Sequence, residues 1–427
     1  MPSKKTDKKA PNISAVTTLN TPLTTMPLVH TKTLNVPLLP QLTSMWCWAA
    51  SAQMVMKYMG HDVTQCKQAN HALNRTDCCN SPIPNACVKG GWPEFPVWKF
   101  ASQTTSWGIA LTFSQLVAQI DANKPFCFSW GWQGGGGHMM VVRGYSSSII
   151  VFSGSGNQMV YINDPWAPNQ GNTRWITYAD FVAKAGDHVH WLDYYNIKYT
   201  GLSAIAIAKS IEEETPTEKQ QPIMNTTSTT SAGYADPETA AREALNYIPL
   251  LVTTDNAKEM GFDSIPRDPS VLALGQPLPI YYIRHNTLTA HYTGQDVRKL
   301  LTDGEEMLYP VFKDGQVVCS VVVAKQQGVW AFRSLGDSNL VKELVEVRNR
   351  QASVSGKDHS KYFIVHIPSL YHMFVAHYDS AGKLLLSHLH DNDNYGFVKH
   401  ASHDAERVIN TILPHAKSLG VSLPGEA

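Results

Sequence analysis

The sequence predicts an α+β fold in two domains of different character. Six of the seven cysteines and ten of the eleven tryptophans lie within residues 1–200, whereas eleven of the seventeen histidines lie after them. In this first part helical patterns come first and strand-like patterns follow, an order typical of α+β folds. Between the two parts, residues 206–235 are rich in Thr, Ser, Glu and Gln and almost free of large apolar side chains, as linkers are.

Charge is also divided unequally along the chain. Overall, 35 Lys and Arg balance 35 Asp and Glu, but residues 1–200 hold 15 against 9, a net charge of +6, and residues 201–427 hold 20 against 26, a net charge of −6. Zero overall charge gives no reason to expect a nucleic acid or an anionic membrane as the main partner. The opposite signs of the two parts favour intramolecular docking of the C-terminal domain near the first domain.

These shifts in composition predict the domain organisation. We expect a flexible tail over residues 1–32, a first domain over 33–205, the linker over 206–235 and an accessory α+β domain of unknown role over 236–427. The tail begins with several lysines, but a Thr- and Pro-rich stretch follows them in place of the continuous apolar run of a secretory signal. No run of 18 apolar residues is present, so the sequence predicts no transmembrane helix.

Within the first domain, the clearest helix has apolar residues from Trp48 to Met59 on one face and a stop at Gly60. Ser114 is suited to cap another helix, which carries an apolar stripe of its own. After Pro125 the pattern alternates as strands do. We expect helices over 46–59, 64–73 and 114–122, and strands over 139–142, 149–152, 159–162, 174–177 and 191–199.

The second domain mixes the two kinds of element. Asp236 and Pro237 are suited to the cap and first turn of a helix, and Asp314-Gly315 is a strong hairpin signal between two apolar runs. We expect helices over 236–246, 340–350 and 404–416, and strands over 280–285, 308–312, 317–323, 362–367, 372–378 and 383–390.

Cys47 is the candidate nucleophile. It lies at or near the start of the first predicted helix, where free backbone N–H groups and the helix dipole favour a thiolate over a thiol. Gln41 lies six residues earlier, before the helix begins. Its side-chain amide and the backbone N–H of Cys47 are therefore a plausible oxyanion hole.

A cysteine nucleophile needs a histidine base that the fold brings to it. His138 follows four glycines and opens a strand, and the glycines allow the backbone to approach a substrate closely. Asp164 ends another strand before Pro165 and is suited to orient the imidazole and stabilise its cation. Neighbouring Asn163 is the alternative for this third role.

These residues and their neighbours resemble the papain-like cysteine peptidases. Residues 41–49 match the family's Gln-x5-Cys-Trp-Ala pattern, and residues 138–145 match its His, apolar strand and Gly-Tyr. Asp164 stands two residues before Trp166, as the family's third catalytic residue stands before a Trp. The likeness is greatest to compact bacterial members with Trp-Cys-Trp-Ala-Ala and Asp-Pro-Trp motifs, including secreted effector peptidases and relatives of the peptidase domains of peptide exporters. It covers about residues 33–200.

The resemblance implies a domain with a helical half and an antiparallel β half, and a Cys-His-Asp triad. Plant and lysosomal members have Asn as the third residue, whereas this sequence has Asp164, as the compact branch does. The C-terminal domain has no counterpart in papain itself.

The remaining cysteines leave alternatives open. Four of them lie within 22 residues, and they suit two disulfides in any of three pairings, a zinc site, or four reduced thiols: Cys66, Cys78, Cys79 and Cys87. We favour disulfides, because the adjacent pair lacks zinc-ligand spacing. Disulfides in turn favour a secreted or exported protein, although a cytoplasmic one is compatible with the missing leader. Cys127 and Cys319 lie in apolar, strand-like runs and are expected to be buried thiols.

Other side chains admit a functional and a structural interpretation. Trp46, Trp48 and Trp166 suit the walls of a cleft or a shield for the triad, and equally the core. His188 and His190 are expected at the surface or at the edge of the β half. His388, His390, Asp391 and Asp393 resemble metal ligands, but a solvated turn explains them better, so no metal site is predicted.

The sequence therefore predicts a cysteine peptidase that hydrolyses peptide bonds through Cys47, His138 and Asp164, with Gln41 at the oxyanion. The expected partner is a protein or peptide substrate, and the chemistry requires no cofactor. Acyl transfer or deamidation by the same triad is one alternative. A non-catalytic binding protein is the other.

Overall fold

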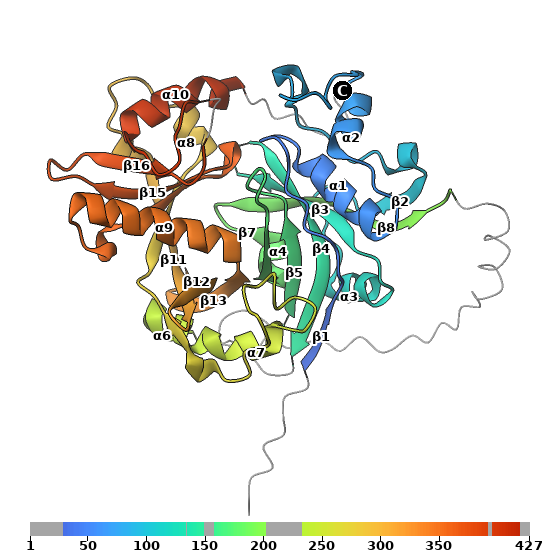
Figure 1. The fold of residues 1–427 in the computed structure, drawn as a ribbon, viewed down its shortest axis with the longest axis horizontal. Coiled ribbons are helices and arrows are strands. Elements are labelled where there is room, and N and C mark those ends of the chain that lie inside the picture. Colours follow the sequence, from blue (N-terminus) through green and yellow to red (C-terminus); the bar gives the residue numbers. More distant parts are fainter. Residues whose placement is uncertain (1–28, 134, 149–157, 202–232, 392–394, 419–427) are drawn as a thin grey trace, which may run out of the picture.

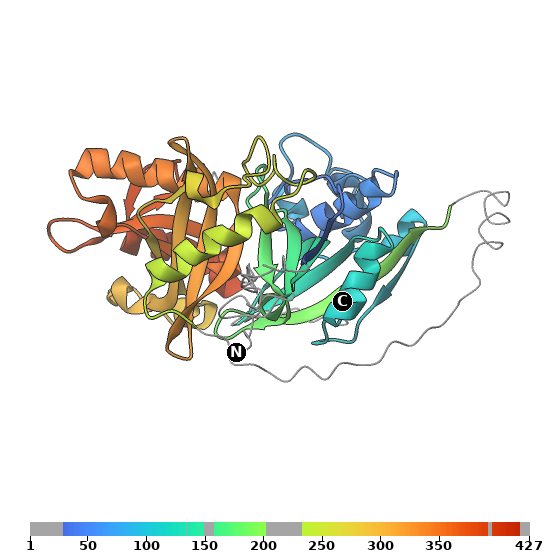
Figure 2. The same ribbon diagram turned by 90° about the horizontal axis from the view of Figure 1, so that it is seen from below.

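A computed structural model describes residues 29–133, 135–148, 158–201, 233–391 and 395–418. The chain combines helices with one large mixed β-sheet and so has an α+β fold. In Figures 1 and 2 the N-terminal half, residues 29–201, lies beside the C-terminal half, residues 233–418. Among the described residues, no helix is both long and apolar enough to cross a bilayer.

The N-terminal half places its helices around an antiparallel sheet. Its helices are α1 (Cys47–Tyr58), α2 (Gln65–Ala72), α3 (Phe113–Asp121) and α4 (Tyr178–Val182), with the short turns η1 (Asn85–Cys87) and η2 (Phe95–Trp98). Its strands are β1 (Val29–Thr33), β2 (Phe100–Thr104), β3 (Phe126–Trp132), β4 (Gly137–Ser148), β5 (Gln158–Asp164), β6 (Asn172–Thr177), β7 (Ala183–Lys184) and β8 (His188–Tyr199).

Helix α1 is buried nearly all round, because it lies between the sheet and the surrounding loops rather than on the surface. Its apolar face packs in one core with β3 and β4. Helix α3 begins one residue earlier than expected, and its cap is Thr112 rather than Ser114. Thr112 and Gln115 form a reciprocal capping box, which satisfies two backbone N–H groups where a serine cap would satisfy one.

The C-terminal half is built in the same mixed manner. Its helices are α6 (Pro237–Ala244), α7 (Ile248–Leu251), α8 (His285–Thr289), α9 (Ser338–Ser355) and α10 (Ala405–Ser418), with the short turns η3 (Leu245–Tyr247), η4 (Pro269–Val271), η5 (Val297–Leu300), η6 (His359–Lys361) and η7 (Pro368–Leu370). Its strands are β9 (Leu272–Leu274), β10 (Leu278–Ile283), β11 (Leu301–Lys313), β12 (Gln316–Gln326), β13 (Val329–Gly336), β14 (Phe363–Ile367), β15 (His372–Tyr378), β16 (Leu384–His388) and β17 (Ser402–Asp404).

Local signals account for several of these elements. Asp236 accepts a hydrogen bond from the backbone of Thr239 and caps α6, with Pro237 at the first position. Asp314 and Gly315 both have positive φ, the turn that a tight hairpin between β11 and β12 requires. The expected strand at 280–285 ends early, because His285 begins α8.

Strand pairing runs without a break from one half to the other. In the N-terminal half the order of neighbours is β2, β8, β3, β4, β5 and β6, and β6 then pairs with β13. The antiparallel register sets Arg174 opposite Gly336 and Ile176 opposite Ser334. The ladder continues through β12, β11, β10, β14, β15, β16 and β17. Strand β13 was not expected from the sequence, and it is the strand that joins the two halves.

A hydrophobic cluster also spans the junction. Met159, Tyr161 and Trp175 of the N-terminal half pack with α6, α7 and the inner faces of β12 and β13. We propose that the two halves correspond to the two domains expected from composition, packed through this cluster. Residues 1–28 of the tail expected over 1–32, most of the linker, the expected strand at 149–152 and Asp393 lie outside the described residues. Residues 29–32 of that tail belong to β1, because this segment pairs with β4 as a strand of the sheet.

Candidate active site

Cys47 occupies the first position of α1. Trp46, the residue before it, makes no side-chain cap, so the N–H groups of the first turn are not satisfied from that residue. The Cys47 thiol accepts a hydrogen bond from the backbone of Met139, next to His138 on β4. Ser51, one turn along α1, donates to the carbonyl of Met139 at 3.0 Å. The helix and the strand are therefore tied together beside the thiol.

His138 and Asp164 are brought together from neighbouring strands. Nε2 of His138 lies 2.6 Å from Oδ1 of Asp164, and both side chains are buried. The backbone N–H of Trp166 donates to the same carboxylate oxygen at 2.9 Å. Nδ1 of His138 has no other hydrogen-bond partner among the described residues and is left for the Cys47 thiol, with which the imidazole is in hydrogen-bond contact.

The contacts among Cys47, His138 and Asp164 shift the pKa of each of these three groups. Burial alone would raise the pKa of Cys47, but the hydrogen bond and positive charge of His138 bring it below its usual value. Burial alone would lower the pKa of His138, but the charge and hydrogen bond of Asp164 raise it to about 9. The pKa of Asp164 is lowered despite its burial, chiefly by the charges of His138 and Arg174. The arrangement favours a thiolate beside an imidazolium.

Arg174 is a site residue that the sequence did not reveal. It lies on β6, and its Nη1 is 2.9 Å from Oδ2 of Asp164 and 3.3 Å from Oδ1 of Asp337. Asp337 belongs to the C-terminal half, immediately after β13. One guanidinium thus neutralises two buried carboxylates from the two halves. No local motif marks Arg174, because its role depends on the pairing of β5 with β6, which brings it to Asp164, and on Asp337, which lies 163 positions further along the chain.

The comparison with known proteins fits this geometry. Residues 33–199 match a family model described as "Peptidase_C39 like family". The match supports a papain-like cysteine peptidase-type domain over these residues. No curated protein is similar enough to the chain to count as a match.

In the peptidase-type domain, Gln41 lies wholly buried before α1. Its Nε2 donates to the carbonyl of Thr43 at 2.8 Å, and its Oε1 has no partner within the described residues. Its backbone accepts from Asn169 and donates to the carbonyl of Pro165, directly after Asp164. The backbone therefore couples the expected oxyanion residue to the loop that carries the carboxylate. The amide has a second N–H that Thr43 does not use.

Asn163, the alternative to Asp164, faces away from the imidazole. Successive residues of a strand point to opposite faces, so only one of the two can reach His138. Asn163 donates to the carbonyl of Val36 at 3.1 Å and accepts from Arg143 at 3.0 Å. Its polar atoms are thus engaged in the core behind the site.

The four clustered cysteines form two disulfides. Cys66 pairs with Cys79, and Cys78 pairs with Cys87. The stapled loop touches both neighbours of the nucleophile, because Trp46 donates to the carbonyl of Cys87 at 2.7 Å and Trp48 donates to the carbonyl of Lys89 at 3.3 Å. Both indoles are buried, so they hold the disulfide loop against α1 rather than present a surface to a cleft. Cys127 and Cys319 are buried thiols, as expected.

Gly137, directly before His138, and Gly131 on the neighbouring strand leave no room for a Cβ beside one aromatic ring. A Cβ at Gly137 would lie 2.1 Å from the ring of Trp191, and one at Gly131 would lie 1.9 Å from the same indole. Trp191 therefore fills the space that the sequence suggested for a substrate backbone. Gly134 lies outside the described residues.

Two other histidine expectations change. His188 and His190 are buried rather than at the surface, because the carbonyls of Asp180 and Phe181 and the carboxylates of Asp187 and Asp193 bind their rings. His388 is also buried rather than in a solvated turn. Its Nδ1 lies 2.5 Å from the carbonyl oxygen of His390, and its Nε2 lies 3.3 Å from Nδ1 of His372.

Tyr371 of the C-terminal half covers the site. Its hydroxyl donates to the carbonyl of Gly137, the residue before His138, and is in hydrogen-bond contact with the Cys47 thiol. Its ring centroid lies 5.3 Å from that of His138 and 5.1 Å from that of Trp166. Trp166 thus supplies its backbone to Asp164 while its ring contacts Tyr371.

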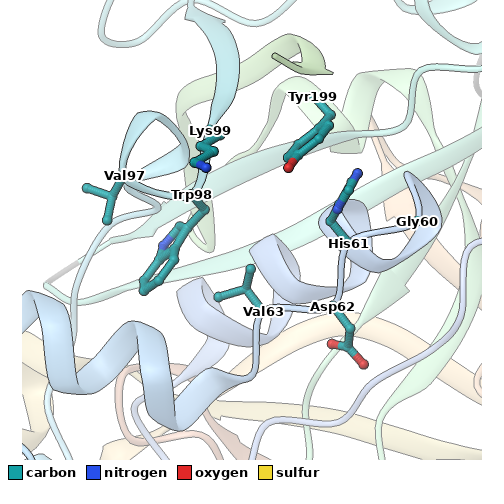
Figure 3. Close-up of a pocket in the computed structure, with 8 residues that line it drawn as sticks. All are labelled: Gly60, His61, Asp62, Val63, Val97, Trp98, Lys99 and Tyr199. Carbon is teal, nitrogen blue, oxygen red and sulfur yellow. The ribbon is translucent and has the colours of Figure 1, made fainter. Parts of the chain in front are cut away.

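An open pocket of about 430 Å³ lies elsewhere, near the ends of α1 and β8 (Figure 3). His61 stacks on Tyr199 there, with ring centroids 3.4 Å apart. None of the expected site residues lines this pocket, which is formed by Gly60, His61, Asp62, Val63, Val97, Trp98, Lys99 and Tyr199. The pocket therefore contributes nothing to the chemistry of Cys47.

Proposed function

We propose that the protein is a cysteine peptidase that hydrolyses peptide bonds through Cys47, His138 and Asp164. The family match indicates cysteine peptidase-type activity. The observation that carries the specific assignment is the buried contact of His138 with Asp164 on one side and Cys47 on the other. The lowered pKa of Cys47 and the raised pKa of His138 support a reactive thiolate.

The reaction divides into two steps. The Cys47 thiolate attacks the peptide carbonyl carbon, forming the C–S bond, and the tetrahedral intermediate collapses as the C–N bond breaks. The imidazolium of His138 gives its proton to the leaving amine. A water molecule then attacks the thioester while neutral His138 accepts its proton, and the carboxylic acid leaves as Cys47 returns to the thiolate. Asp164 holds the imidazole in place throughout and stabilises its cation.

In this proposal, the side-chain amide of Gln41 and the backbone N–H of Cys47 stabilise the oxyanion of the tetrahedral intermediate. The start of α1 provides free N–H groups at the nucleophile, and the Gln41 side chain has one N–H that Thr43 does not occupy. Such donors act best when they are fixed before the reaction. The backbone bonds that fix Gln41 to Pro165 and Asn169 support this role.

Mass spectrometry of products tests the proposal. The full chain is incubated with an unfolded polypeptide, and new amino termini are identified. Cleavage is expected for the wild type and for Cys127→Ala, which removes another buried thiol, but not for Cys47→Ala. Cleavage that persists in Cys47→Ala would refute the site.

A primary amine added to the same reaction tests the alternatives. Amine incorporation or Gln deamidation without new amino termini would replace hydrolysis by acyl transfer or deamidation with the same residues. Binding of the polypeptide by the unmodified protein, without cleavage, deamidation or amine incorporation, would favour a non-catalytic binding protein.

A further inference from the structure

The proposed catalytic residues are closed off from solvent. Cys47 is 9% exposed, His138 4%, Asp164 5% and Gln41 0%. A peptide carbonyl carbon must approach within about 3–3.5 Å of the sulfur to react. The described arrangement leaves no such approach, because a side chain from the C-terminal half already occupies the position beside the sulfur.

That side chain is Tyr371, at the end of a short turn between β14 and β15. The turn begins with η7, and the backbone of Ser369 lies against Gly136, where an added Cβ would be 3.7 Å from the Ser369 carbonyl oxygen. Tyr371 closes the turn by donating its backbone N–H to the carbonyl of Pro368 at 3.0 Å. The turn thus lies against the glycine segment that leads to the imidazole.

Tyr371 has an unfavourable backbone conformation for its type. Its φ is 54°, in the left-handed region that glycine and asparagine adopt readily and bulky residues rarely adopt. An outlier of this kind is energetically unfavourable and persists where the surrounding contacts require it. Here the contacts are those of the phenol with Gly137, Cys47, His138 and Trp166.

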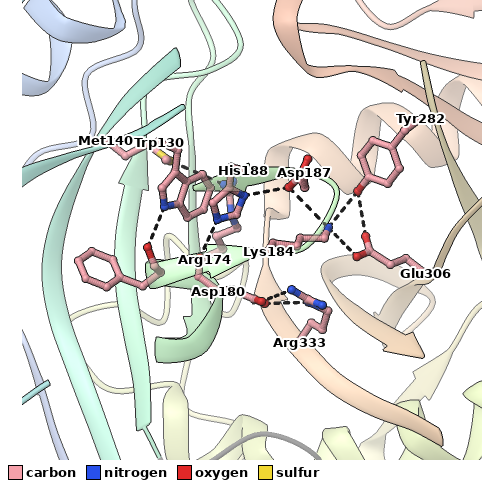
Figure 4. A network of polar contacts seen from close by, with 11 residues as sticks. Trp130, Met140, Arg174, Asp180, Lys184, Asp187, His188, Tyr282, Glu306 and Arg333 are labelled. Atoms are coloured by element: carbon pink, nitrogen blue, oxygen red, sulfur yellow. Dashed lines mark hydrogen bonds and ion pairs between the residues drawn. The ribbon is translucent and has the colours of Figure 1, made fainter. Parts of the chain in front are cut away.

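The rest of the junction holds the turn in place. Four ion pairs cross between the halves within the part of the chain that the structure describes: Arg143 with Glu259, Arg174 with Asp337, Lys184 with Glu306, and Arg333 with Asp180. Figure 4 shows two of them, Lys184 with Glu306 and Arg333 with Asp180, beside the network that also joins Tyr282 and Asp187. Together with the β6–β13 ladder and the shared apolar cluster, these pairs keep the C-terminal half on the peptidase-type domain. Opening therefore requires the short turn to move rather than the whole half to dissociate.

We infer that the C-terminal half is a built-in inhibitor of the proposed peptidase, with Tyr371 as the side chain that plugs the site. This inference rests on the proposed function of Cys47 and His138. The phenol occupies the approach to the sulfur, and its hydroxyl satisfies the backbone carbonyl of Gly137. A substrate gains access when the turn from Pro368 to Tyr371 swings away while the strand ladder between the halves stays intact.

Tyr371→Gly tests the inference without straining the backbone, because glycine adopts a φ of 54° readily. The rate of Cys47 alkylation by iodoacetamide is measured by mass spectrometry in the full chain. A site that opens only as a minor conformer reacts at a fraction of its full rate, so the variant is expected to react about tenfold faster or more. Tyr371→Asn keeps the left-handed turn and gives a second variant if the first fails to fold.

Gln327→Gly is the matched control. Gln327 also lies in a left-handed turn of the C-terminal half, at φ 50°, but away from the site between β12 and β13. In Gln327→Gly, Cys47 is expected to be alkylated at the wild-type rate. Alkylation of the buried thiols Cys127 and Cys319 reports global unfolding in every sample. Tyr371→Phe, which keeps the ring, is expected to stay closed.

The outcomes separate the two proposals. Equal Cys47 alkylation in folded Tyr371→Gly and in the wild type would overturn the inhibitor role, whatever the peptide cleavage. Slower alkylation in Tyr371→Gly would overturn it too, and would make Tyr371 a positioning residue. Faster Cys47 alkylation in Tyr371→Gly without any polypeptide cleavage would support Tyr371 as the side chain that closes the site and would count against the peptidase function.

Discussion

The hydroxyl group of Tyr371 donates a hydrogen bond to the backbone carbonyl of Gly137, although the two residues are 234 positions apart in the chain. Gly137 precedes His138, and the same hydroxyl is in contact with the Cys47 thiol. The C-terminal half therefore reaches the proposed nucleophile and base at once. This contact joins the regulation of the site to the packing of the two halves.

Asp164→Asn is expected to lower the reactivity of Cys47 at neutral pH. The amide can still bind the imidazole, but without the carboxylate charge the pKa of His138 falls from about 9 towards its usual 6.5. Each pKa unit of that fall shifts the equilibrium from the thiolate–imidazolium pair towards the neutral thiol and imidazole by about 1.4 kcal/mol. Combining Asp164→Asn with Tyr371→Gly allows the alkylation rate at pH 7 to be compared with that of Tyr371→Gly alone.

Asn163→Ala is the matched control for that experiment. It removes the hydrogen bonds to Val36 and Arg143 and is expected to lower the free energy of unfolding by about 1–3 kcal/mol. The alkylation rate of the folded protein should be unchanged. A loss of Cys47 reactivity in Asn163→Ala, with none in Asp164→Asn, would exchange the roles of the two residues.

The pH dependence of Cys47 alkylation should be that of a thiolate–imidazolium ion pair formed by Cys47 and His138. The thiolate and imidazolium coexist above the lowered pKa of Cys47 and below the raised pKa of His138, about 9. In Tyr371→Gly, alkylation should therefore be fast through neutral pH. Removing the base as well, by His138→Ala, leaves burial as the main influence and should shift the alkylation profile to higher pH. Identical profiles with and without His138 would contradict the pairing.

Arg174→Met is expected to destabilise the protein by about 3–5 kcal/mol. The substitution leaves the buried carboxylates of Asp164 and Asp337 without their shared cation. Adding Asp337→Asn should restore part of the loss, which a double-mutant cycle in chemical denaturation measures. Arg298→Met is the control, because Arg298 forms an exposed pair with Asp296 and its loss should cost little.

Breaking the Cys66–Cys79 disulfide by paired serine substitutions should lower the free energy of unfolding by about 2–3 kcal/mol. The adjoining Cys78–Cys87 disulfide continues this loop to Cys87, whose carbonyl accepts from Trp46, and Lys89 just beyond it accepts from Trp48, so the indoles on both sides of Cys47 depend on the stapled segment. The rate of Cys47 alkylation in the Tyr371→Gly background should therefore change as well. Denaturation curves with and without reductant check the first effect, and a variant without all four loop cysteines should be insensitive to reductant.

Mild acid is expected to destabilise the region around the Tyr371 turn. His388 is buried and His366 is partly buried, and desolvation lowers the pKa of each to about 4, while His372 between them lies well below its usual pKa for the same reason. Since the unfolded chain binds protons near pH 6.5, their stability contribution is complete above that pH and is lost towards pH 4. The loss is about 1 kcal/mol per pH unit for each group.

Charged and titratable neighbours on every side decide how far this effect reaches. His366 faces Asp187, Lys184, Glu306 and Arg174, and His372 faces His388, His415 and His366. Thermal unfolding at pH 7 and pH 5 measures the loss, and His388→Gln should reduce the difference between the two temperatures. Cys47 alkylation that rises on acidification in the wild type more than in Tyr371→Gly would connect acid to opening of the turn.

The local elements and the order of the chemical groups along the chain can be predicted from the amino-acid sequence alone. Cys47 at a helix start, His138 at a strand start and Asp164 at a strand end can each be read from short patterns, because helix stops, apolar periodicity and Asx-Pro turns act over a few residues. The same holds for the Asp314-Gly315 hairpin and the cap at Asp236.

The surroundings of those groups depend on tertiary contacts that no short sequence pattern reveals. Arg174 joins Asp164 to Asp337, β13 pairs with β6 and so joins the strands of the two halves into one sheet, and Tyr371 covers Cys47. None of these contacts carries a periodic or local pattern, since each joins segments more than a hundred residues apart or depends on which strands become neighbours. Chain topology brings these side chains together, and burial then makes their charges and hydrogen bonds strong.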